Sequence, residues 1–317
     1  MKKLPLLIIL SLFCFVSCGA ATATFSLADF SNMPLVETEL DGVKATLILD
    51  TGASHTTFDT AFVTNVFPKA KLTSVTLLGT TNVRAGTPGP CVFGAKKLKV
   101  GDLALDAADA MAFPLGQLSS VVGRKVDGIL GMNHLATRPF VLSLADGRIV
   151  WDPPAEVCAG FVRVKSRLRG NRRELVARLP NGEELGLLID SGSTWTFVED
   201  RYWRTTARKT SVASADLNRR ANETMRTGEK GLIDCGIRFE IEPMIAPQPG
   251  LNQLGAATLK DIDVLFDADG VSLRLRNGKL LSADYSRQFR PCSQSSAADS
   301  HIPHLAIADG RSAFKGK

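Results

Sequence analysis

The sequence predicts an all-β protein built from two similar lobes, and three observations lead to this prediction. A length of 317 residues is enough for two domains of ordinary size. Hydrophobic residues make up 44% of the chain and charged residues 22%, which is ordinary for a globular protein and leaves enough apolar material for a core. A pattern of short apolar segments and tight turns occurs twice in the same order, which indicates duplication of one β-rich unit.

Each copy of the pattern opens as strand, turn and strand. In the first copy, residues 35–40 and 43–49 flank Asp41-Gly42, and the second strand ends at Asp50-Thr51-Gly52. In the second copy, residues 175–179 and 183–189 flank Asn181-Gly182, and the strand ends at Asp190-Ser191-Gly192. Asp-Gly and Asn-Gly pairs between apolar runs are strong signals for hairpin turns. We therefore expect each of the two aspartates at the end of an apolar strand.

The later part of the pattern is also duplicated. Leu130-Gly131 in the first copy corresponds to Leu254-Gly255 in the second, and each pair has a further leucine four residues after the glycine. Two expected strands and a turn then close each copy: residues 141–142, Asp146-Gly147 and 149–151 in the first, and residues 264–265, Asp269-Gly270 and 271–275 in the second. Agreement at several markers in one order favours a true internal repeat over chance.

These markers set the expected domain limits. Residues 24–155 form the N-terminal lobe and residues 156–288 the C-terminal lobe, with a connector near Pro153–Cys158, where two prolines disfavour regular structure. Residues 289–317 are rich in Ser, Ala and Asp, and we expect them to form a flexible tail. Residues 1–23 are expected to be a signal peptide.

Both aspartate segments resemble the active-site loops of aspartic peptidases. The segments that carry the resemblance are Leu47-Ile48-Leu49-Asp50-Thr51-Gly52-Ala53-Ser54 and Leu187-Leu188-Ile189-Asp190-Ser191-Gly192-Ser193-Thr194. Val126–Met132 resembles the strand that packs beside the active-site loop in that family. The resemblance covers roughly residues 30 to 285 and implies two retropepsin-like β-barrel lobes with the active-site cleft between them, fused in one chain as an internal pseudo-dimer and otherwise monomeric.

The resemblance also implies a site and an activity. Asp50 and Asp190 are the expected catalytic pair, and the chain is expected to be an aspartic endopeptidase acting on a polypeptide substrate without a cofactor. The expected supporting residues of the two loops are Thr51, Gly52, Ala53, Ser191, Gly192 and Ser193, with Thr51 and Ser191 bonding across the pseudo-dyad. Residues 75–87 are the candidate flap hairpin, with Leu78, Gly79 and Thr80 near its tip. It lacks the tyrosine of pepsin-like flaps and is closer to the retroviral type.

The chemistry needs two carboxyl groups close together. Peptide hydrolysis by water requires a base for the water and an acid for the carbonyl oxygen and the leaving amine. Two carboxyls about 3 Å apart share one proton and can fill both roles, as they do in aspartic proteases. The loops differ after the glycine, where Ala53 stands opposite Ser193. A hydroxyl at Ser193 could donate to the neighbouring carboxylate, so our hypothesis is that Asp190 carries the charge and Asp50 the proton.

The N-terminus is typical of an exported protein. Met1-Lys2-Lys3 precedes an apolar run from Leu4 to Val16 that has the length of a signal-peptide core and is too short to span a bilayer. Two processing sites compete: Ala21-Thr22-Ala23 fits signal peptidase, and Phe15-Val16-Ser17-Cys18 resembles a lipobox with Cys18 as the lipidated residue. We expect a location in the periplasm or cell envelope, with membrane anchoring through Cys18 as one alternative.

Cysteine content agrees with export. Cys91, Cys158, Cys235 and Cys292 would allow two disulfides with three connectivities in an oxidising compartment. No CxxC pair and only four histidines occur, so no metal site is expected.

The formal net charge of +6 raises the question of a nucleic-acid partner, which we do not expect. Basic residues become more frequent after Lys165, but few aromatic residues lie between them, so we interpret them as a solvated face. They are Arg167, Arg169, Arg172, Arg173, Arg204, Arg208, Lys209, Arg219 and Arg220.

Two alternatives stay open from sequence alone. The first is a catalytically inactive relative that binds extended peptides in the same cleft. The second is a structural envelope lipoprotein in which the repeat serves only as a β scaffold. A serine or cysteine hydrolase is disfavoured because the chain has no Gly-x-Ser-x-Gly elbow, and no phosphate-binding glycine loop is present.

Overall fold

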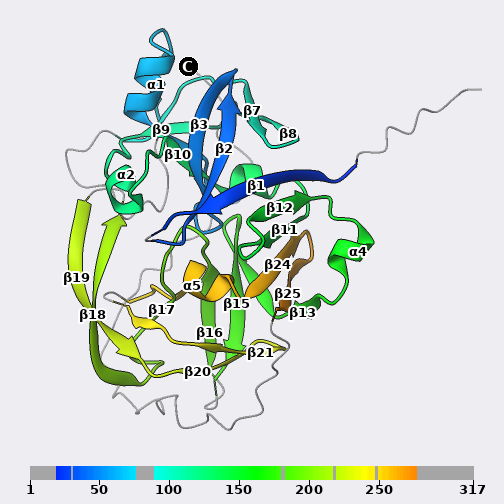
Figure 1. Cartoon of the computed structure of the whole chain (residues 1–317), viewed down its shortest axis with the longest axis vertical. Helices are drawn as coiled ribbons and strands as arrows, with labels where there is room; N and C mark the ends of the chain where they lie inside the picture. The colour runs from blue at the N-terminus through cyan, green and yellow to red at the C-terminus, as the bar shows by residue number, and fades with distance from the viewer. Residues whose placement is uncertain are drawn as a thin grey trace, which may run out of the picture.

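The protein is all-β, as predicted, with five short helices among the residues that the computed structural model describes: 19–29, 31–75, 89–179, 183–216, 219–246 and 249–276 (Figure 1). The helices are α1 (Thr60–Val66), α2 (Gln117–Val122), α3 (Met132–Leu135), α4 (Ala155–Cys158) and α5 (Ala256–Leu259). The first repeat is defined as residues 21–151 and the second repeat as residues 162–275. None of the helices in this part of the chain is long and apolar enough to cross a membrane.

The first repeat is organised around the hairpin of β2 (Pro34–Leu40) and β3 (Val43–Leu49), which pair antiparallel from Leu40 and Val43 outward. The turn residues Asp41 and Gly42 both have positive φ, of 46° and 88°. This is the backbone that a two-residue hairpin turn requires and that Asp-Gly adopts readily. The Asp41 carboxylate also accepts hydrogen bonds from the amides of Lys96 and Lys97. The turn is thereby tied to the neighbouring strand.

The remaining short strands of the first repeat extend this sheet. In the order of the sheet, β10 lies between β3, to which it is parallel, and β4, to which it is antiparallel. Gly128 of β10 has no room for a side chain, because a Cβ there would meet the Thr57 carbonyl oxygen. The strands are β4 (Thr57–Asp59), β5 (Thr73–Ser74), β6 (Cys91–Val92), β7 (Lys97–Val100), β8 (Leu103–Asp106), β9 (Met111–Phe113) and β10 (Gly128–Leu130).

The second repeat builds an eight-stranded sheet with the same central arrangement. Strand β23 runs parallel to β16 and antiparallel to β17, as β10 does to β3 and β4. The strands of this sheet are β14 (Ser166–Arg169), β15 (Arg172–Arg178), β16 (Glu184–Ile189), β17 (Phe197–Val198), β18 (Thr205–Asp216), β19 (Arg219–Gly228), β22 (Met244–Ile245) and β23 (Gln253–Leu254). A separate hairpin joins β20 (Gly231–Asp234) and β21 (Arg238–Ile241).

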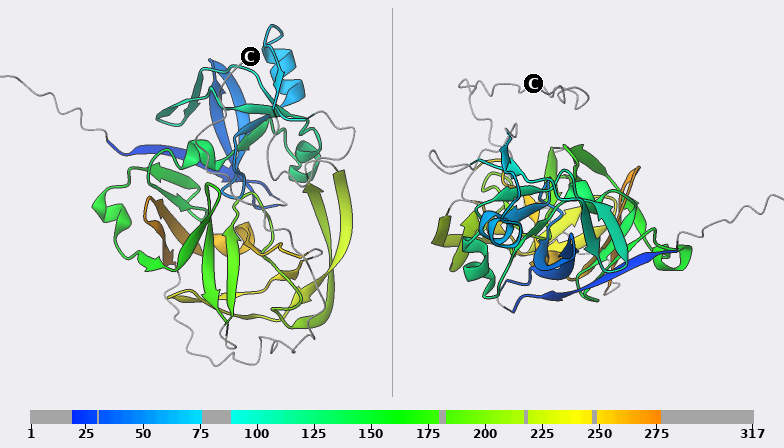
Figure 2. Two further views of the ribbon diagram at one scale, coloured as in Figure 1. Left: turned by 180° about the vertical axis from the view of Figure 1, so that it is seen from behind. Right: turned by 90° about the horizontal axis from the view of Figure 1, so that it is seen from above.

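The two repeats are joined by strands and by a long hairpin. The closing strands of both repeats lie in one continuous sheet, in the order β13 (Val162–Val164), β25 (Gly270–Leu275), β24 (Ile262–Asp267), β11 (Phe140–Ser143), β12 (Arg148–Trp151) and β1 (Ala21–Leu27). At its centre, the rings of Phe140 and Phe266 stack with centroids 4.6 Å apart. Hairpin β18–β19 of the second repeat also reaches α2 of the first (Figure 2). The chain therefore packs around one shared core.

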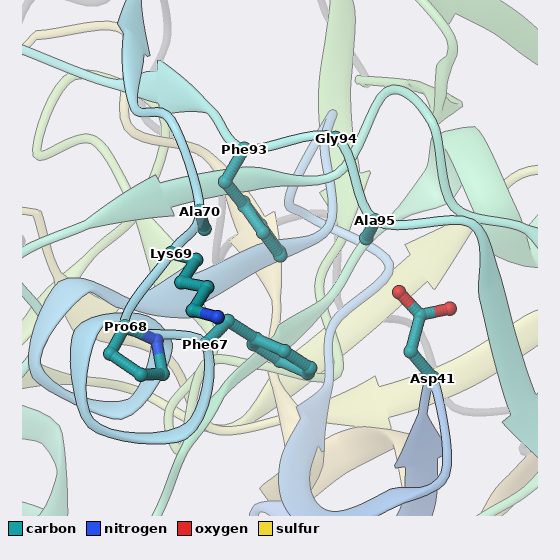
Figure 3. Close-up of a pocket in the computed structure, with 8 residues that line it drawn as sticks. All are labelled: Asp41, Phe67, Pro68, Lys69, Ala70, Phe93, Gly94 and Ala95. Atoms are coloured by element: carbon teal, nitrogen blue, oxygen red, sulfur yellow. The ribbon is translucent and has the colours of Figure 1, made fainter.

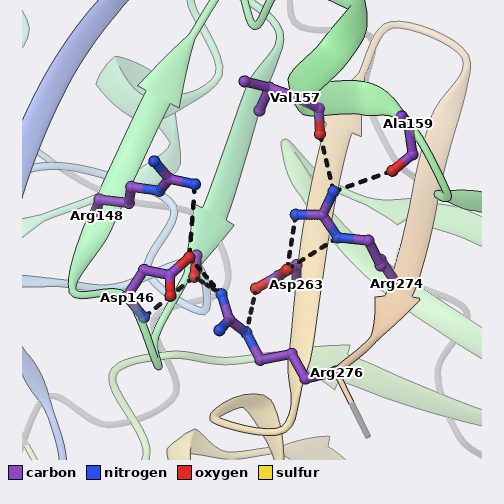
Figure 4. Close-up of polar contacts among 8 residues, drawn as sticks. Asp146, Arg148, Val157, Ala159, Asp263, Arg274 and Arg276 are labelled. Atoms are coloured by element: carbon purple, nitrogen blue, oxygen red, sulfur yellow. Dashed lines mark hydrogen bonds and ion pairs between the residues drawn. The ribbon is translucent and has the colours of Figure 1, made fainter. Parts of the chain in front are cut away.

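An ion-pair network fixes the join between the closing strands (Figure 4). The side chain of Asp263 is 3% exposed and accepts hydrogen bonds from Arg274 and Arg276. Arg276 reaches across to Asp146 of the first repeat, which also pairs with Arg148. The guanidinium of Arg274 donates further to the carbonyl oxygens of Val157 and Ala159, in and after the connector helix α4. Because the buried carboxylate has two cationic partners, its desolvation is compensated.

The structure departs from the sequence expectations at the start of the chain and at the cysteines. Strand β1 begins at Ala21 and pairs Ala21, Thr22 and Ala23 with residues of β12, so the expected lobe limit at residue 24 falls inside a strand. The expected two disulfides are not present: Cys91, Cys158 and Cys235 are free thiols, although two bridges among four cysteines would require one within these three. Cys292, the Asn181-Gly182 turn, the expected tail 289–317 and most of the expected leader lie outside the described residues.

Candidate active site

Each aspartate of the expected pair stands where a central strand ends. Asp50 follows β3 and Asp190 follows β16, and the neighbouring parallel strand holds each in place. The Asp50 amide donates to the Leu130 carbonyl oxygen at 3.0 Å, and the Asp190 amide donates to that of Leu254 at 2.9 Å. Each aspartate therefore sits on a rigid strand end rather than on a free loop.

The Leu-Gly markers of the repeat pack directly against the aspartate loops. A Cβ on Gly131 would collide with the backbone of His55, and one on Gly255 with that of Trp195. The Gly131 amide donates to Thr56 Oγ1 at 3.0 Å, and the Gly255 amide donates to Thr196 Oγ1 at 3.1 Å. The glycines are thus required by close backbone approach, which sequence analysis had used only as a marker of the repeat.

Thr51 and Ser191 link the two loops reciprocally. The Thr51 amide donates to Ser191 Oγ at 3.0 Å, and the Ser191 amide donates to Thr51 Oγ1 at 3.1 Å. Each hydroxyl then donates across the pair, Thr51 to the carbonyl oxygen of Ile189 at 2.8 Å and Ser191 to that of Leu49 at 2.7 Å. Both side chains are completely buried. All four bonds cross between the repeats, so they fix the separation of the two strand ends.

The carboxyl groups of Asp50 and Asp190 meet at this junction and share a hydrogen bond. Gly52 and Gly192 make the approach possible, because a Cβ on Gly52 would overlap the Asp190 carboxyl group and one on Gly192 would overlap that of Asp50. Oδ1 of Asp50 also accepts from the amides of Gly52 at 2.7 Å and Ala53 at 2.9 Å. The amides of Gly192 and Ser193 donate hydrogen bonds to the Asp190 carboxyl group in the same way. The arrangement is a carboxyl dyad held by its own loops.

The two carboxyls differ in acidity. Desolvation raises the pKa of both above the ordinary aspartate value. For Asp190, the negative charge of Asp50 and the hydrogen bond between the two carboxyls raise the pKa further, to well above the usual range. For Asp50, the same hydrogen bond, the amides of Gly52 and Ala53, and the Arg172 guanidinium all lower the pKa and oppose desolvation. One shared proton and one negative charge on the pair are therefore favoured over two charged carboxylates.

The hypothesis drawn from Ser193 was wrong about the hydrogen-bond partner of its hydroxyl. Ser193 Oγ donates to the carbonyl oxygen of Trp195 at 2.9 Å and makes a local turn contact. It therefore does not favour the charged form of Asp190. The contact of Ser193 with the dyad is made by its backbone amide, which donates to Asp190. The Ala53 amide makes the equivalent contact with Asp50.

Two residues of the site were missed by sequence reasoning. Asn171 and Arg172, at the β14–β15 turn, reach the first aspartate loop: Asn171 Nδ2 donates to the Ser54 carbonyl oxygen at 2.7 Å, and Arg172 Nη1 donates to that of Gly52 at 3.1 Å. Arg172 is one of the basic residues interpreted as a solvated face, and for this residue the interpretation is wrong. No periodicity or motif marks it, because its neighbour is an aspartate loop 120 residues away.

Only the base of the candidate flap hairpin lies within the described residues. Leu78, Gly79 and Thr80 lie outside them, and so does Cys18. At the base, Thr73 and Ser74 pair antiparallel with Val92 and Cys91, and the Val75 amide donates to the Pro90 carbonyl oxygen at 2.9 Å. The described strands on either side of residues 76–88 therefore pair antiparallel.

No group of three or more His, Cys, Asp or Glu side chains among the described residues is arranged to hold a metal ion. A pocket of about 340 Å³ lies apart from the dyad, between the end of α1 and the β2–β3 turn (Figure 3). It is lined by Asp41, Phe67, Pro68, Lys69, Ala70, Phe93, Gly94 and Ala95. The Asp41 carboxylate in it is already engaged by backbone amides, so the pocket offers no free acid.

Comparison with known proteins bears on the first repeat. Residues 36–134 match the family model described as aspartyl protease. The match begins in β2, contains the Asp50 loop and the Leu130-Gly131 pair, and ends in α3. It does not extend to the Asp190 loop. No curated protein matches the chain. Together with the all-β fold, the match supports a place among the aspartic peptidases and a hydrolase of the aspartic-protease type.

Proposed function

We propose that the chain is an aspartic endopeptidase whose catalytic residues are Asp50 and Asp190. The observation that carries the proposal is the hydrogen-bonded carboxyl pair at the centre of the reciprocal Thr51–Ser191 contacts. A structural scaffold has no need for two adjacent acids, because burial desolvates both carboxyls and their like charges repel each other. Perturbed acids at such a junction are typical of functional sites.

The acidity difference assigns the steps. Asp50, as the carboxylate, removes a proton from water, and the resulting hydroxyl adds to the carbonyl carbon of the substrate peptide. Asp190 gives its proton to the carbonyl oxygen, which yields a gem-diol and leaves the dyad with the single proton taken from water. In the second step the C–N bond breaks, the nitrogen receives the proton from Asp50, and one diol hydroxyl returns a proton to Asp190. The products are a carboxylic acid and an amine, and the dyad regains its starting state.

We also propose that the protein is exported and that its leader ends before β1. Support comes from the contacts of residues 21–23, which a cut after Ala23 would remove. Ala21 and Ala23 are 9% and 3% exposed, and the Thr22 carbonyl oxygen accepts a hydrogen bond from the Asp102 amide. Processing before Cys18 would leave the whole strand in the mature protein, which favours the lipidated alternative. Mass spectrometry of the N-terminal peptide from expressed full-length chain tests this, and a mature N-terminus at Thr24 would contradict it.

The activity is tested with purified residues 19–317 and a mixed peptide library between about pH 3 and pH 7. Asp50→Asn and Asp190→Asn should each reduce cleavage by about 10²–10⁴-fold, because each removes one acid–base partner. The matched control is Asp234→Asn, which neutralises a half-exposed aspartate paired with Arg238 and should leave cleavage unchanged. Folding of every variant is checked by circular dichroism.

The outcomes separate the two functional classes. Cleavage by the parent, its loss in both dyad variants and its retention in the control establish an aspartic peptidase, and the cut sites give its specificity. A folded parent that binds peptides but cleaves none at any pH contradicts the proposal. That result would leave the inactive peptide-binding protein as the better description.

A further inference from the structure

Arg172 occupies an unusual position for an arginine of the basic segment. It leaves the β14–β15 turn, where Gly170 has a positive φ of 67°, and its guanidinium donates to the carbonyl oxygen of Gly52 in the loop of the other repeat. The adjacent Asn171 holds the next part of that loop through Ser54. Two consecutive side chains of the second repeat therefore clamp the Asp50 loop from outside.

The register of the strands shows that the clamp is one-sided. Continuing the β15–β16 pairing by two residues places Arg172 opposite Asp190. The guanidinium of Arg172 nevertheless donates to the loop of the other aspartate, Asp50. Continuing the β2–β3 pairing by two residues brings Met33 level with Asp50. Met33 packs against an apolar cluster and carries no charge. The repeat thus places an arginine beside the dyad from only one of the two equivalent positions.

The charges around Arg172 leave the dyad as its main counter-charge. The groups that face it are Arg169 and Glu174 on its own hairpin, Asp190 and Asp50 from the two loops, and His55 beyond the Asp50 loop. The Glu174 carboxylate is already engaged by two other arginines, as Arg167 lies 2.8 Å and Arg169 3.1 Å from it. Arg172 Nε has no hydrogen-bond partner within the described residues. A half-buried arginine so placed gains most from a negative charge on the carboxyl pair.

We propose that Arg172 is a positioning residue for the dyad, an inference that rests on the proposed function: it holds the Asp50 loop through the Gly52 carbonyl and supplies the fixed positive charge that keeps one negative charge on the carboxyl pair. An arginine suits this task because it stays protonated even when partly desolvated.

The acidities agree with the geometry. Arg172 is among the groups that lower the pKa of Asp50, while the pKa of Asp190 is raised well above its usual range by desolvation and by the charge of Asp50. Burial lowers the pKa of Arg172 itself, and the two dyad carboxyls raise it again. The interaction is therefore mutual.

Titration of the dyad carboxyls tests the proposal without requiring activity. In protein labelled with ¹³C at the aspartate carboxyls, resonances of Asp50 and Asp190 are assigned from the Asp50→Asn and Asp190→Asn variants and followed against pH. Arg172→Gln should move both titration steps of the dyad upward by about one pH unit, because a nearby positive charge lowers the pKa of a carboxyl by this order. Arg172→Met is a second neutral variant if Gln folds poorly.

Three controls separate charge from packing. Arg172→Lys retains the charge and should leave the titration close to that of the parent. Asn171→Ala removes the neighbouring clamp without a charge change and should not move either step. Arg169→Gln removes a half-exposed charge that pairs with Glu174, and its shift should be much smaller than that of Arg172→Gln.

If the parent cleaves peptides, the same shifts should appear in both limbs of its kcat/KM–pH profile. Unchanged titration in Arg172→Gln and Arg172→Met, or an equal shift in Arg172→Lys, would overturn the inference. A parent without peptidase activity whose dyad still titrates upward in Arg172→Gln would leave the inference standing and remove only the proposed function.

Discussion

The two aspartate loops share one backbone and have different electrostatic surroundings. In both loops the aspartate amide bonds to the Leu-Gly strand, a glycine lies against the opposite carboxyl, and a buried hydroxyl bonds across the junction. Among the described residues, however, an arginine contacts only the Asp50 loop from outside.

This difference shows which properties a duplicated unit preserves. The backbone network is set by strand ends and close packing, so it is the same wherever the motif recurs. The charge distribution is set by side chains from other elements, and these differ between the repeats. A carboxyl pair in identical surroundings would share its proton evenly, whereas the surroundings of Asp50 and Asp190 differ in charge.

Substitution of Gly52 or Gly192 should give the largest loss of activity, and the loss should be similar for the two residues. Gly52→Ala and Gly192→Ala each place a methyl group where the opposite carboxyl lies, and displacement of a reacting group by about 1 Å can cost 10²-fold or more in rate. Peptide cleavage assays should show losses of at least this size for both variants. Gly116→Ala, at a site with open space around it, is the control and should be active. Survival of activity in one of the two loop variants would break the equivalence.

Removal of the reciprocal hydroxyl contacts of Thr51 and Ser191 should give the next largest effects. The effects should be similar in the two loops, because the contacts are symmetric. Thr51→Val or Ser191→Ala leaves a buried amide and a buried carbonyl group without partners, at a cost of about 1–3 kcal/mol each in the free energy of unfolding. Urea denaturation of both single variants and the double variant should show coupling, since the residues belong to one network. Thr64→Val, which removes an exposed helical hydroxyl contact, should change stability little. Additive costs would argue against a shared network.

The pH dependence of stability should reveal the asymmetry. A carboxyl whose folded-state pKa is raised contributes stability that is complete below the unfolded pKa, near 3.8, and is lost as pH rises through the folded value. Asp190→Asn should therefore be more stable than the parent near pH 7, and this gain should vanish below about pH 4. Asp50→Asn should gain less stability, because two loop amides and Arg172 lower the pKa of Asp50 and so offset part of the rise that burial causes. Urea midpoints at several pH values check the order, and a larger gain for Asp50→Asn would contradict it.

Ser193 should give the smallest effect. Its hydroxyl contacts the Trp195 carbonyl oxygen, so Ser193→Ala should cost no more than about 1.5 kcal/mol in stability. The two limbs of the pH–activity profile should not move. An upward shift of the alkaline limb, which Asp190 governs as the acid, would show instead that the hydroxyl donates to Asp190 in solution.

Much of this architecture could be read from local sequence. Asp41-Gly42 predicts its hairpin because few residues adopt the positive φ that the turn requires. The apolar runs ending at Asp50 and Asp190 are strands, and the glycines after them and in the Leu-Gly pairs stand where backbones touch. Such features depend on residues close together in the chain, or on a repeat that presents the same constraint twice.

By itself, then, the sequence determined the all-β class, the repeat and the pair of acids at its strand ends. Only the tertiary structure decided that burial and the neighbouring carboxyl raise the pKa of Asp190, that the described cysteines remain free, that β1 starts before Ala23 and that Arg172 reaches the Asp50 loop. The reason is physical: backbone geometry follows from short-range sterics and periodicity, whereas the acidity of a carboxyl depends on desolvation and on charges brought from distant segments of the chain.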